Sequence, residues 1–398
     1  MLLELTDEQE FIINEAVNWY LNSSSNLFQF TGPAGTGKSV VLNSIVARLG
    51  LTIDEIAPMS YIGASAIVMR RKGLYNARTI HSWLYNPIEK AKTDINGNVV
   101  VNDYFNLPVY EIGFTPKPLA GVKLILIDEA GAVPYQLKEE IDRRGIKTIA
   151  CGDLNQLPPP MSKPGYLVSG KIYRLTKIMR QAEQSPIIFL SQRASAGLPI
   201  HAGVYGNSMV IESCDLTKEM LRGTTISLCG KNKTRDSLNH IIRQLKMNTD
   251  IKLPVFNDLL ICRKNNWNIE SNGLNLANGL IGTVLNNPDP TRFNGKTFSI
   301  DFLPLGSTVP FEDVKCDYQY FISPIEQKQF LKNAKYQTGE KFEFAYAITT
   351  HISQGSQFNN GIYFEEYLNR DINNKLNYTG ITRFSDWLIY VIPSKKYY

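Results

Sequence analysis

The sequence has little from which to build a disulfide framework or a metal cluster. It contains five scattered cysteines without a CxxC pair, and four histidines that show no metal-ligand spacing. This pattern excludes a disulfide-rich secreted domain and a zinc site, and it fits a reducing cytosol. No apolar run approaches the roughly 20 residues that a membrane-spanning helix needs. The N-terminus is acidic after a few apolar residues and does not resemble a signal peptide, so we expect an intracellular, cytoplasmic protein without a membrane partner.

A strong charge of either sign is also missing. The net charge is +5, which permits a polyanionic partner without requiring one. Hydrophobic residues make up 43% and charged residues 20%, which excludes a disordered chain. A length of 398 residues predicts two to four domains, and no internal repeat or low-complexity linker separates them.

A glycine-rich segment near the N-terminus carries the clearest chemical signal. It matches G-x-x-x-x-G-K-[ST] at every position, as Gly32-Pro33-Ala34-Gly35-Thr36-Gly37-Lys38-Ser39. An apolar strand precedes it and apolar residues at helical spacing follow it, which is the context of a phosphate-binding loop (P-loop). Its N–H groups are expected to surround a phosphate, with Lys38 reaching the β- and γ-phosphates and Ser39 binding Mg²⁺. The sequence therefore predicts ATP and Mg²⁺ as ligands.

Two adjacent carboxylates narrow the chemistry. Asp128 and Glu129 follow the hydrophobic run 124–127, which reads as a buried strand. Asp128 at the end of such a strand suits a Mg²⁺ ligand, and Glu129 suits a general base that activates water. This pair favours hydrolysis over transfer of a phosphoryl group to a small molecule.

Five further segments then resemble the motifs of superfamily 1 helicases, in the order of that family. They are Thr79–Ser82, Gly152–Pro159 (GDLNQLPP), Leu175–Gln181, Thr349–Ser356 and Tyr378–Arg383. The resemblance runs from about residue 5 to 390. The chain is therefore identified as similar to the RecD-like branch of superfamily 1B, and most similar to the small phage helicases of the Dda type.

This resemblance implies an α/β fold of two RecA-like P-loop lobes, each carrying an insertion. The first lobe is expected over 1–83 and 119–171, with a β-hairpin pin at 84–118. The second lobe is expected over 172–253 and 342–398, with an SH3-like β-barrel at 254–341. The residues support both insertions, because Asn96-Gly97, Asn278-Gly279 and Asn294-Gly295 are turn signals between β-like runs. Ile95, Val99 and Phe105 are the candidates for an apolar pin tip that separates bases.

The resemblance also implies roles around the nucleotide. Gln156 suits a γ-phosphate sensor, and Arg180 and Arg383 suit arginine fingers that neutralise charge on the phosphoryl oxygens. Gly355 is expected to contact the nucleotide. Gln9 resembles the glutamine that reads adenine, which we favour, although the capping-box pattern 6–9 also explains it.

Contacts with DNA follow from the resemblance residue by residue. The predicted contacts are Pro58, Ser60, Thr79, His81, Trp83, Asn265, His351, Ser353 and Gln354, with Tyr85 and Trp267 as further stacking candidates. Two positions depart from the family. The stretch 59–64 lacks the usual Thr-Gly-Lys/Arg-Ala, where Ser60 is a substitute, and Ile352 stands where a lysine is usual, which predicts weaker DNA binding.

Together these features predict an ATP-dependent DNA helicase that moves 5′→3′ on single-stranded DNA and unwinds forks in phage-type replication or recombination. The alternatives are a DNA-stimulated translocase that displaces proteins with little unwinding, and an RNA motor. Single-strand-binding or recombination proteins are the expected partners. A monomer is expected from the family, in an infected bacterial host if the chain is phage-encoded.

Overall fold

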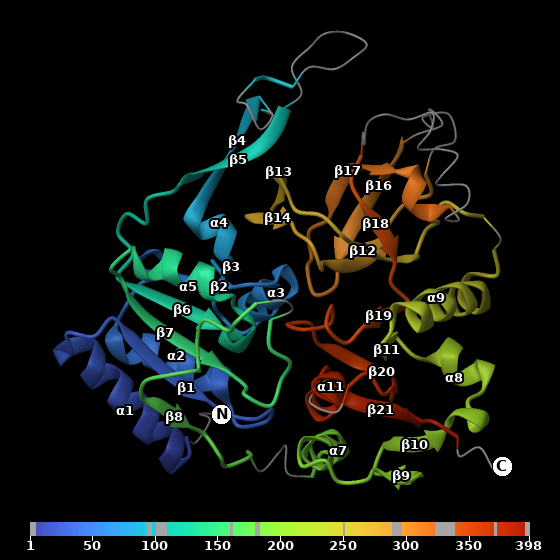
Figure 1. The fold of residues 1–398 in the computed structure, drawn as a ribbon, viewed down its shortest axis with the longest axis horizontal. Helices are drawn as coiled ribbons and strands as arrows, with labels where there is room; N and C mark the ends of the chain where they lie inside the picture. Colours follow the sequence, from blue (N-terminus) through green and yellow to red (C-terminus); the bar gives the residue numbers. More distant parts are fainter. Residues whose placement is uncertain are drawn as a thin grey trace.

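The structure is a computed structural model of the chain. It describes residues 5–91, 93, 98–100, 110–159, 162–179, 184–249, 251–288, 297–322, 339–369 and 372–394. Two parallel sheets with flanking helices lie side by side, a smaller β-sheet lies above the second, and a hairpin projects above the first (Figure 1).

The first sheet has the order β3-β2-β6-β7-β1-β8, and all its strand pairs are parallel. Its strands are β1 (Leu27–Thr31), β2 (Ile56–Ser60), β3 (Arg78–Thr79), β6 (Leu124–Asp128), β7 (Lys147–Gly152) and β8 (Ile172–Arg174). Its helices are α1 (Asp7–Asn22), α2 (Lys38–Leu49), α3 (Gly63–Arg71), α4 (Ile80–Leu84) and α5 (Tyr135–Asp142). The strands lack alternation because helices cover both faces, and separate apolar clusters form on each side. We call this body the first lobe.

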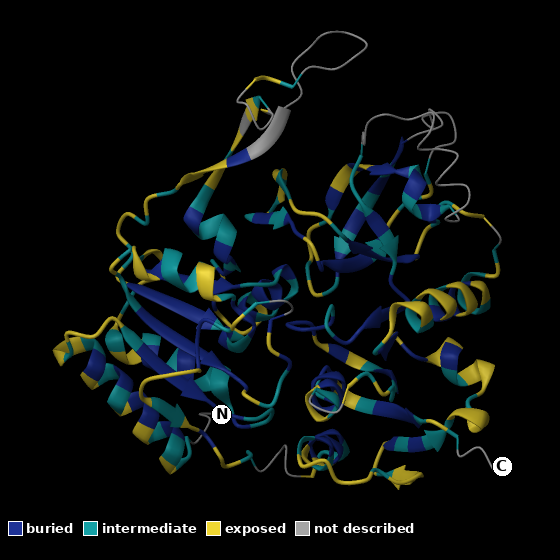
Figure 2. Cartoon of the chain, in the orientation of Figure 1, coloured by how far each residue is buried: buried dark blue, intermediate teal, exposed yellow. Residues whose placement is uncertain are grey.

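The second lobe is built in the same way, on a sheet of order β19-β11-β20-β21-β10-β9. Its strands are β9 (Gly203–Tyr205), β10 (Ser208–Glu212), β11 (Ile226–Cys229), β19 (Ala347–Thr349), β20 (Phe358–Phe364) and β21 (Phe384–Ile392). Its helices are α7 (Pro186–Ser195), α8 (Lys218–Gly223), α9 (Asn232–Met247) and α11 (Asn373–Ile381). Only β9 pairs antiparallel, at the edge. Figure 2 shows buried strands in both lobes under partly exposed helices.

The insertion in the second lobe forms an antiparallel sheet of order β17-β16-β15-β12-β18, with a two-stranded sheet beside it. Its strands are β12 (Leu259–Cys262), β13 (Asn266–Ser271), β14 (Leu274–Leu276), β15 (Ile281–Val284), β16 (Thr297–Pro304), β17 (Phe311–Asp317) and β18 (Phe342–Phe344). A buried ion pair joins it to the second lobe: Arg243 donates to both Asp258 carboxylate oxygens, and Tyr346 Oη donates to the same carboxylate at 2.6 Å. The guanidinium also lies over the Phe344 ring.

The insertion in the first lobe is a hairpin of β4 (Tyr85–Ala91) and β5 (Tyr110–Pro116), paired in register. The predicted tip residues Ile95 and Phe105, and the turn 96–97, lie outside the described residues, whereas Val99 is described and exposed. The names pin and SH3-like barrel therefore stay predictions.

The predicted two-lobe α/β fold is confirmed, and two boundaries differ in detail. The strand β8 pairs with β1 of the first sheet, although the second lobe was expected to begin at residue 172. The strand β18 pairs with β12 of the insertion, although the insertion was expected to end at residue 341. Strand pairing at such edges depends on contacts between distant segments, which local composition does not report.

Candidate nucleotide site

The P-loop connects β1 to α2 through a left-handed turn. Gly35 and Gly37 have φ angles of 84° and 81°, which side chains rarely adopt. A Cβ atom at Gly37 would also lie 2.4 Å from Gln9 Nε2, so this glycine is required twice. The turn directs the N-terminus of α2, with its unpaired N–H groups, toward the loop.

A cavity of about 600 Å³ opens at this loop and is lined by both lobes. The first lobe contributes Ala34, Gly35, Gly37, Lys38, Ser39, Asp128, Glu129 and Gln156, and the second contributes Gly355, Ser356, Gln357, Thr382 and Arg383. A cavity shared by two lobes allows a ligand to change how they fit together.

Two lysine side chains at the P-loop donate hydrogen bonds to oxygen atoms of the protein. Lys38 Nζ donates to the carbonyl oxygens of Gly32 at 2.8 Å and Pro33 at 3.2 Å. Lys72 Nζ, from the end of α3, donates to Ser39 Oγ at 3.1 Å. A cation thus already lies against the hydroxyl predicted to bind Mg²⁺.

The donors fit Mg²⁺, which prefers oxygen ligands and keeps several waters and phosphate oxygens. Ser39 and Asp128 line the same cavity. Asp128 Oδ1 accepts from Glu129 N at 2.9 Å and from Cys151 Sγ at 3.3 Å, which fixes the carboxylate. The described part of the chain contains no group of three or more His, Cys, Asp or Glu able to hold a metal alone. A bound Mg²⁺ would therefore take most of its ligands from water and nucleotide.

The Glu129 carboxylate lies beside the Arg383 guanidinium of the second lobe and the Gln156 amide of the first lobe. Arg383 Nη1 lies 3.7 Å from Glu129 Oε1. With its nitrogen facing Glu129, the Gln156 amide donates to Oε2 at 3.2 Å and accepts from Arg383 Nη2 at 3.1 Å. Burial raises the pKa of Glu129, Arg383 opposes the rise, and Asp128 adds to it. The backbone of Glu129 has a φ of 54°, a strained value typical of functional sites.

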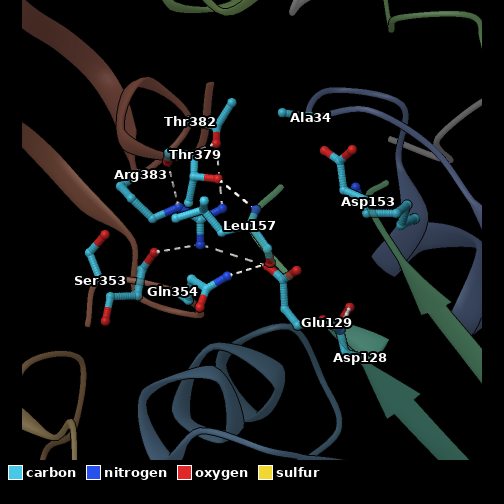
Figure 3. Close-up of polar contacts among 12 residues, drawn as sticks. Ala34, Asp128, Glu129, Asp153, Leu157, Ser353, Gln354, Thr379, Thr382 and Arg383 are labelled. Carbon is cyan, nitrogen blue, oxygen red and sulfur yellow. Dashed lines mark hydrogen bonds and ion pairs between the residues drawn. The ribbon is translucent and has the colours of Figure 1, made fainter. Parts of the chain in front are cut away.

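The segment after β7 connects this site to the second lobe (Figure 3). Leu157 N donates to Thr379 Oγ1 at 3.0 Å, and Leu157 O accepts from Gln354 Nε2 at 2.7 Å. Both backbone groups of one residue are therefore held by the other lobe. Tyr378 Oη donates to Asp153 Oδ2 and accepts from Ala34 N at 2.9 Å.

The structure thus brings together most of the predicted nucleotide residues, whose roles stay predictions. Gln9 is fully buried, forms the capping box with Thr6, and donates through Nε2 to Thr36 O at 3.0 Å. It supports the P-loop, and its contact with adenine stays a prediction. Arg180 lies outside the described residues.

The predicted DNA residues of the first lobe lie on β2, β3 and α4. Thr79 is buried and caps α4 through Ser82 N. Trp83 Nε1 donates to Pro58 O at 2.9 Å, which fixes the indole. The buried Ser60 hydroxyl has no hydrogen-bond partner among the described residues.

The predicted DNA residues on the second lobe are placed differently from expectation. Ser353 and Gln354 are buried: Ser353 Oγ donates to Thr350 O at 2.8 Å, and Gln354 donates to Leu157 O of the first lobe. Both side chains are buried in this conformation, and their contact with DNA stays a prediction. His351 is half-buried, and Asn265 is exposed with its amide oxygen accepting from Asn278 N at 2.7 Å.

Four aromatic rings join the hairpin to the insertion. His81 lies 6.1 Å from Tyr85 and 6.0 Å from Trp267, and Phe114 lies 5.9 Å from Tyr85 and 5.8 Å from Trp267, between ring centroids. Burial lowers the pKa of His81, which favours a neutral ring suited to stacking. Phe114 is exposed and was not predicted, because only its neighbours in space identify it.

Sequence reasoning also missed Tyr378, Thr379, Asp153 and Lys72. The first three lie inside segments that resemble helicase motifs, so the signal was present, but only Gln156 and Arg383 were assigned from those segments. Lys72 lies outside those segments, and its neighbour Arg70 is no closer guide to the site. Arg70 instead donates to Ala77, Asn272 and Gly273 carbonyl oxygens and holds β13 and β14 against α3.

Comparison with known proteins assigns this chain to a family. A family model described as an AAA domain matches residues 4–212, just over half of the chain. The chain belongs to the AAA-domain family. An uncharacterised protein of Methanocaldococcus jannaschii is 25% identical, with the match covering 92% of this chain and 36% of that protein. The ATP-dependent DNA helicase RRM3 of Saccharomyces cerevisiae is 29% identical over 47% of this chain and 27% of its own length. The AAA-domain chain thus spans about a third or less of these curated relatives.

A solved structure supports the same assignment of fold. The Pif1 helicase from Bacteroides in complex with ADP-AlF3 and single-stranded DNA has a TM-score of 0.55 at 16% identity, covering 98% of this chain and 92% of that one. The resemblance to superfamily 1B helicases is confirmed in family and fold, and closeness to the Dda type stays a prediction. Among the described residues of this AAA-domain protein, no helix is long and apolar enough to cross a membrane.

Proposed function

We propose that this AAA-domain protein is an ATP-dependent DNA helicase that translocates 5′→3′ on single-stranded DNA and unwinds forks. One observation carries the proposal: Glu129 of the first lobe, the predicted base, lies 3.7 Å from Arg383 of the second in the shared cavity. A γ-phosphate that enters there is expected to separate the pair and draw Arg383 to itself.

Hydrolysis then alters the lobe contact. Loss of the γ-phosphate returns Arg383 and Gln156 to Glu129, and the Leu157 backbone transmits the change because Thr379 and Gln354 hold it. Alternating closure and opening moves the strand when the lobes grip it in turn. The aromatic cluster of His81, Tyr85, Phe114 and Trp267 offers stacking surfaces beside the hairpin.

The family resemblance supplies four further parts of this proposal. They are the direction of movement, the role of the hairpin as a pin, Mg²⁺ as the metal, and a place in replication or recombination. The Bacteroides relative was solved with single-stranded DNA, which supports that ligand here. The monomeric state and the partner proteins are inferred in the same way.

ATP hydrolysis with and without a single-stranded DNA oligonucleotide tests the proposal. We expect stimulation of about a hundredfold, equivalent to roughly 2.7 kcal/mol of barrier. Lys38→Ala should abolish it, whereas Lys218→Ala, on the exposed surface of α8, should not. A rate of ATP hydrolysis that does not change when nucleic acid is added would refute the proposed helicase function. A preference for RNA, or stimulation without unwinding of forks carrying 5′ tails, would instead identify an RNA motor or a translocase.

A further inference from the structure

A buried tyrosine hydroxyl joins three segments of the nucleotide site. Tyr378 lies in α11 of the second lobe and is 2% exposed. Its hydroxyl donates to Asp153 Oδ2 and accepts from Ala34 N of the P-loop at 2.9 Å. One oxygen atom therefore links the second lobe to the P-loop and to the segment after β7.

The same helix end holds Arg383. The Arg383 Nε atom donates to Thr379 O at 3.2 Å, and Nη1 donates to Ser356 O at 3.4 Å. The guanidinium is thus fixed to the backbone beside Tyr378. Any shift of this helix end relative to the P-loop moves Arg383 relative to a nucleotide bound there.

The residue on the other side of the hydroxyl, Asp153, holds the backbone that leads to Gln156, because its carbonyl oxygen accepts from Gln156 N at 3.3 Å. Asp153 is buried, and its Oδ1 accepts from Asn155 N at 2.9 Å, next to Gln156 in the chain. Burial raises the pKa of Tyr378, so the hydroxyl keeps its proton at neutral pH and remains a donor. Both groups that contact Glu129 are therefore tied to one hydroxyl.

We propose that Tyr378 is a positioning residue for ATP hydrolysis, because its hydroxyl aligns Arg383 and Gln156 with the nucleotide on the P-loop. The inference rests on the hydrolytic part of the proposed function and is independent of DNA. Alignment of an arginine finger matters most in the transition state, where charge grows on the phosphoryl oxygens. Removal of the hydroxyl also leaves Ala34 N free for a phosphate, so ground-state binding is retained.

The test compares affinities of Tyr378→Phe for fluorescent ADP, with Mg²⁺, in the absence and presence of aluminium fluoride, which mimics the transferred phosphoryl group. We expect ADP affinity within about twofold of the wild type and analogue affinity lowered about tenfold. The kcat of hydrolysis should fall by the same factor while KM stays constant. Asp153→Asn is the second variant, for use if Tyr378→Phe folds poorly. It removes the charge that holds the hydroxyl, and it should show the same pattern of affinities.

Tyr346→Phe is the matched control. The residue is similarly buried, at 3% exposure, and its hydroxyl donates to the buried Asp258, but it joins the second lobe to the insertion rather than to the P-loop. Its ratio of analogue to ADP affinity should equal that of the wild type. The inference is overturned if Tyr378→Phe keeps the wild-type ratio of analogue to ADP affinity, or if Tyr346→Phe lowers that ratio as much. It is also overturned if the wild type does not bind the analogue more tightly than ADP. A wild type that ignores DNA would refute the helicase alone.

Discussion

Replacement of Arg383 by alanine should remove most of the ATP hydrolysis, and the distance between Arg383 and Glu129 gives the expected size of the loss. Opposite unit charges 3.7 Å apart attract by roughly 4.5 kcal/mol at an effective dielectric constant of about 20. A γ-phosphate that takes over this cation gains an interaction of the same order in the transition state. The corresponding loss of kcat is on the order of a thousandfold, which agrees with the range of about 10³–10⁵ for arginine fingers.

The pH dependence gives a second, independent signature. Burial raises the pKa of Glu129, and Arg383 opposes that rise. Glu129 acts as a base only when ionised, so wild-type activity should decline as the pH falls through this raised pKa. Without Arg383 the pKa of Glu129 rises further, and the decline should begin at higher pH.

Steady-state hydrolysis over a range of pH measures both effects. Arg383→Lys keeps the charge without the two-pronged geometry and should be intermediate. Arg48→Ala, which breaks an exposed ion pair with Glu10 in the same lobe as the P-loop, should match the wild type. Arg383→Ala that retains more than about a tenth of the activity, with an unshifted acid limb, would refute the reasoning.

Three further predictions concern stability and DNA. Asp258→Ala leaves Arg243 buried without its carboxylate and should cost about 3–5 kcal/mol in urea denaturation; a loss below about 1 kcal/mol would contradict a buried ion pair. Trp267→Ala should weaken single-stranded DNA binding by about 1–3 kcal/mol in a fluorescence titration, with ADP binding unchanged; equal affinity would show that its ring serves only to pack against His81 and Phe114. Ile352→Lys should tighten DNA binding and steepen its dependence on log salt by about one unit; an unchanged slope would mean that no phosphate lies near residue 352.

Much of the nucleotide site followed from the sequence because its chemistry is local. The P-loop conformation depends on glycines within eight residues, and the φ angles of Gly35 and Gly37 are those that the pattern requires. The capping box of α1 is likewise formed within four residues, as predicted for Thr6 and Gln9. The buried strand before Asp128 was predictable because apolar runs without alternation are typical of parallel sheets.

The DNA-facing assignments stay predictions, because exposure depends on how the lobes meet. Ser353 and Gln354 lie in a segment that resembles a DNA-contacting motif, yet Gln354 donates to Leu157, 197 residues away in the chain. The edge strands β8 and β18 crossed the predicted boundaries for a similar reason, since pairing at an edge is a contact between distant segments.

The sequence by itself indicated a nucleotide site on the P-loop, the residues expected to surround the phosphates, and two α/β lobes with insertions that carry the site. These features arise from local patterns whose physical requirements are short in range. Only the tertiary structure decided that Arg383 and Gln156 meet at Glu129, and that Tyr378 spans Ala34 and Asp153. The contacts of Arg383 with Glu129 and of Tyr378 with Ala34 and Asp153 join residues more than 200 positions apart on opposite lobes, and packing alone brings them together.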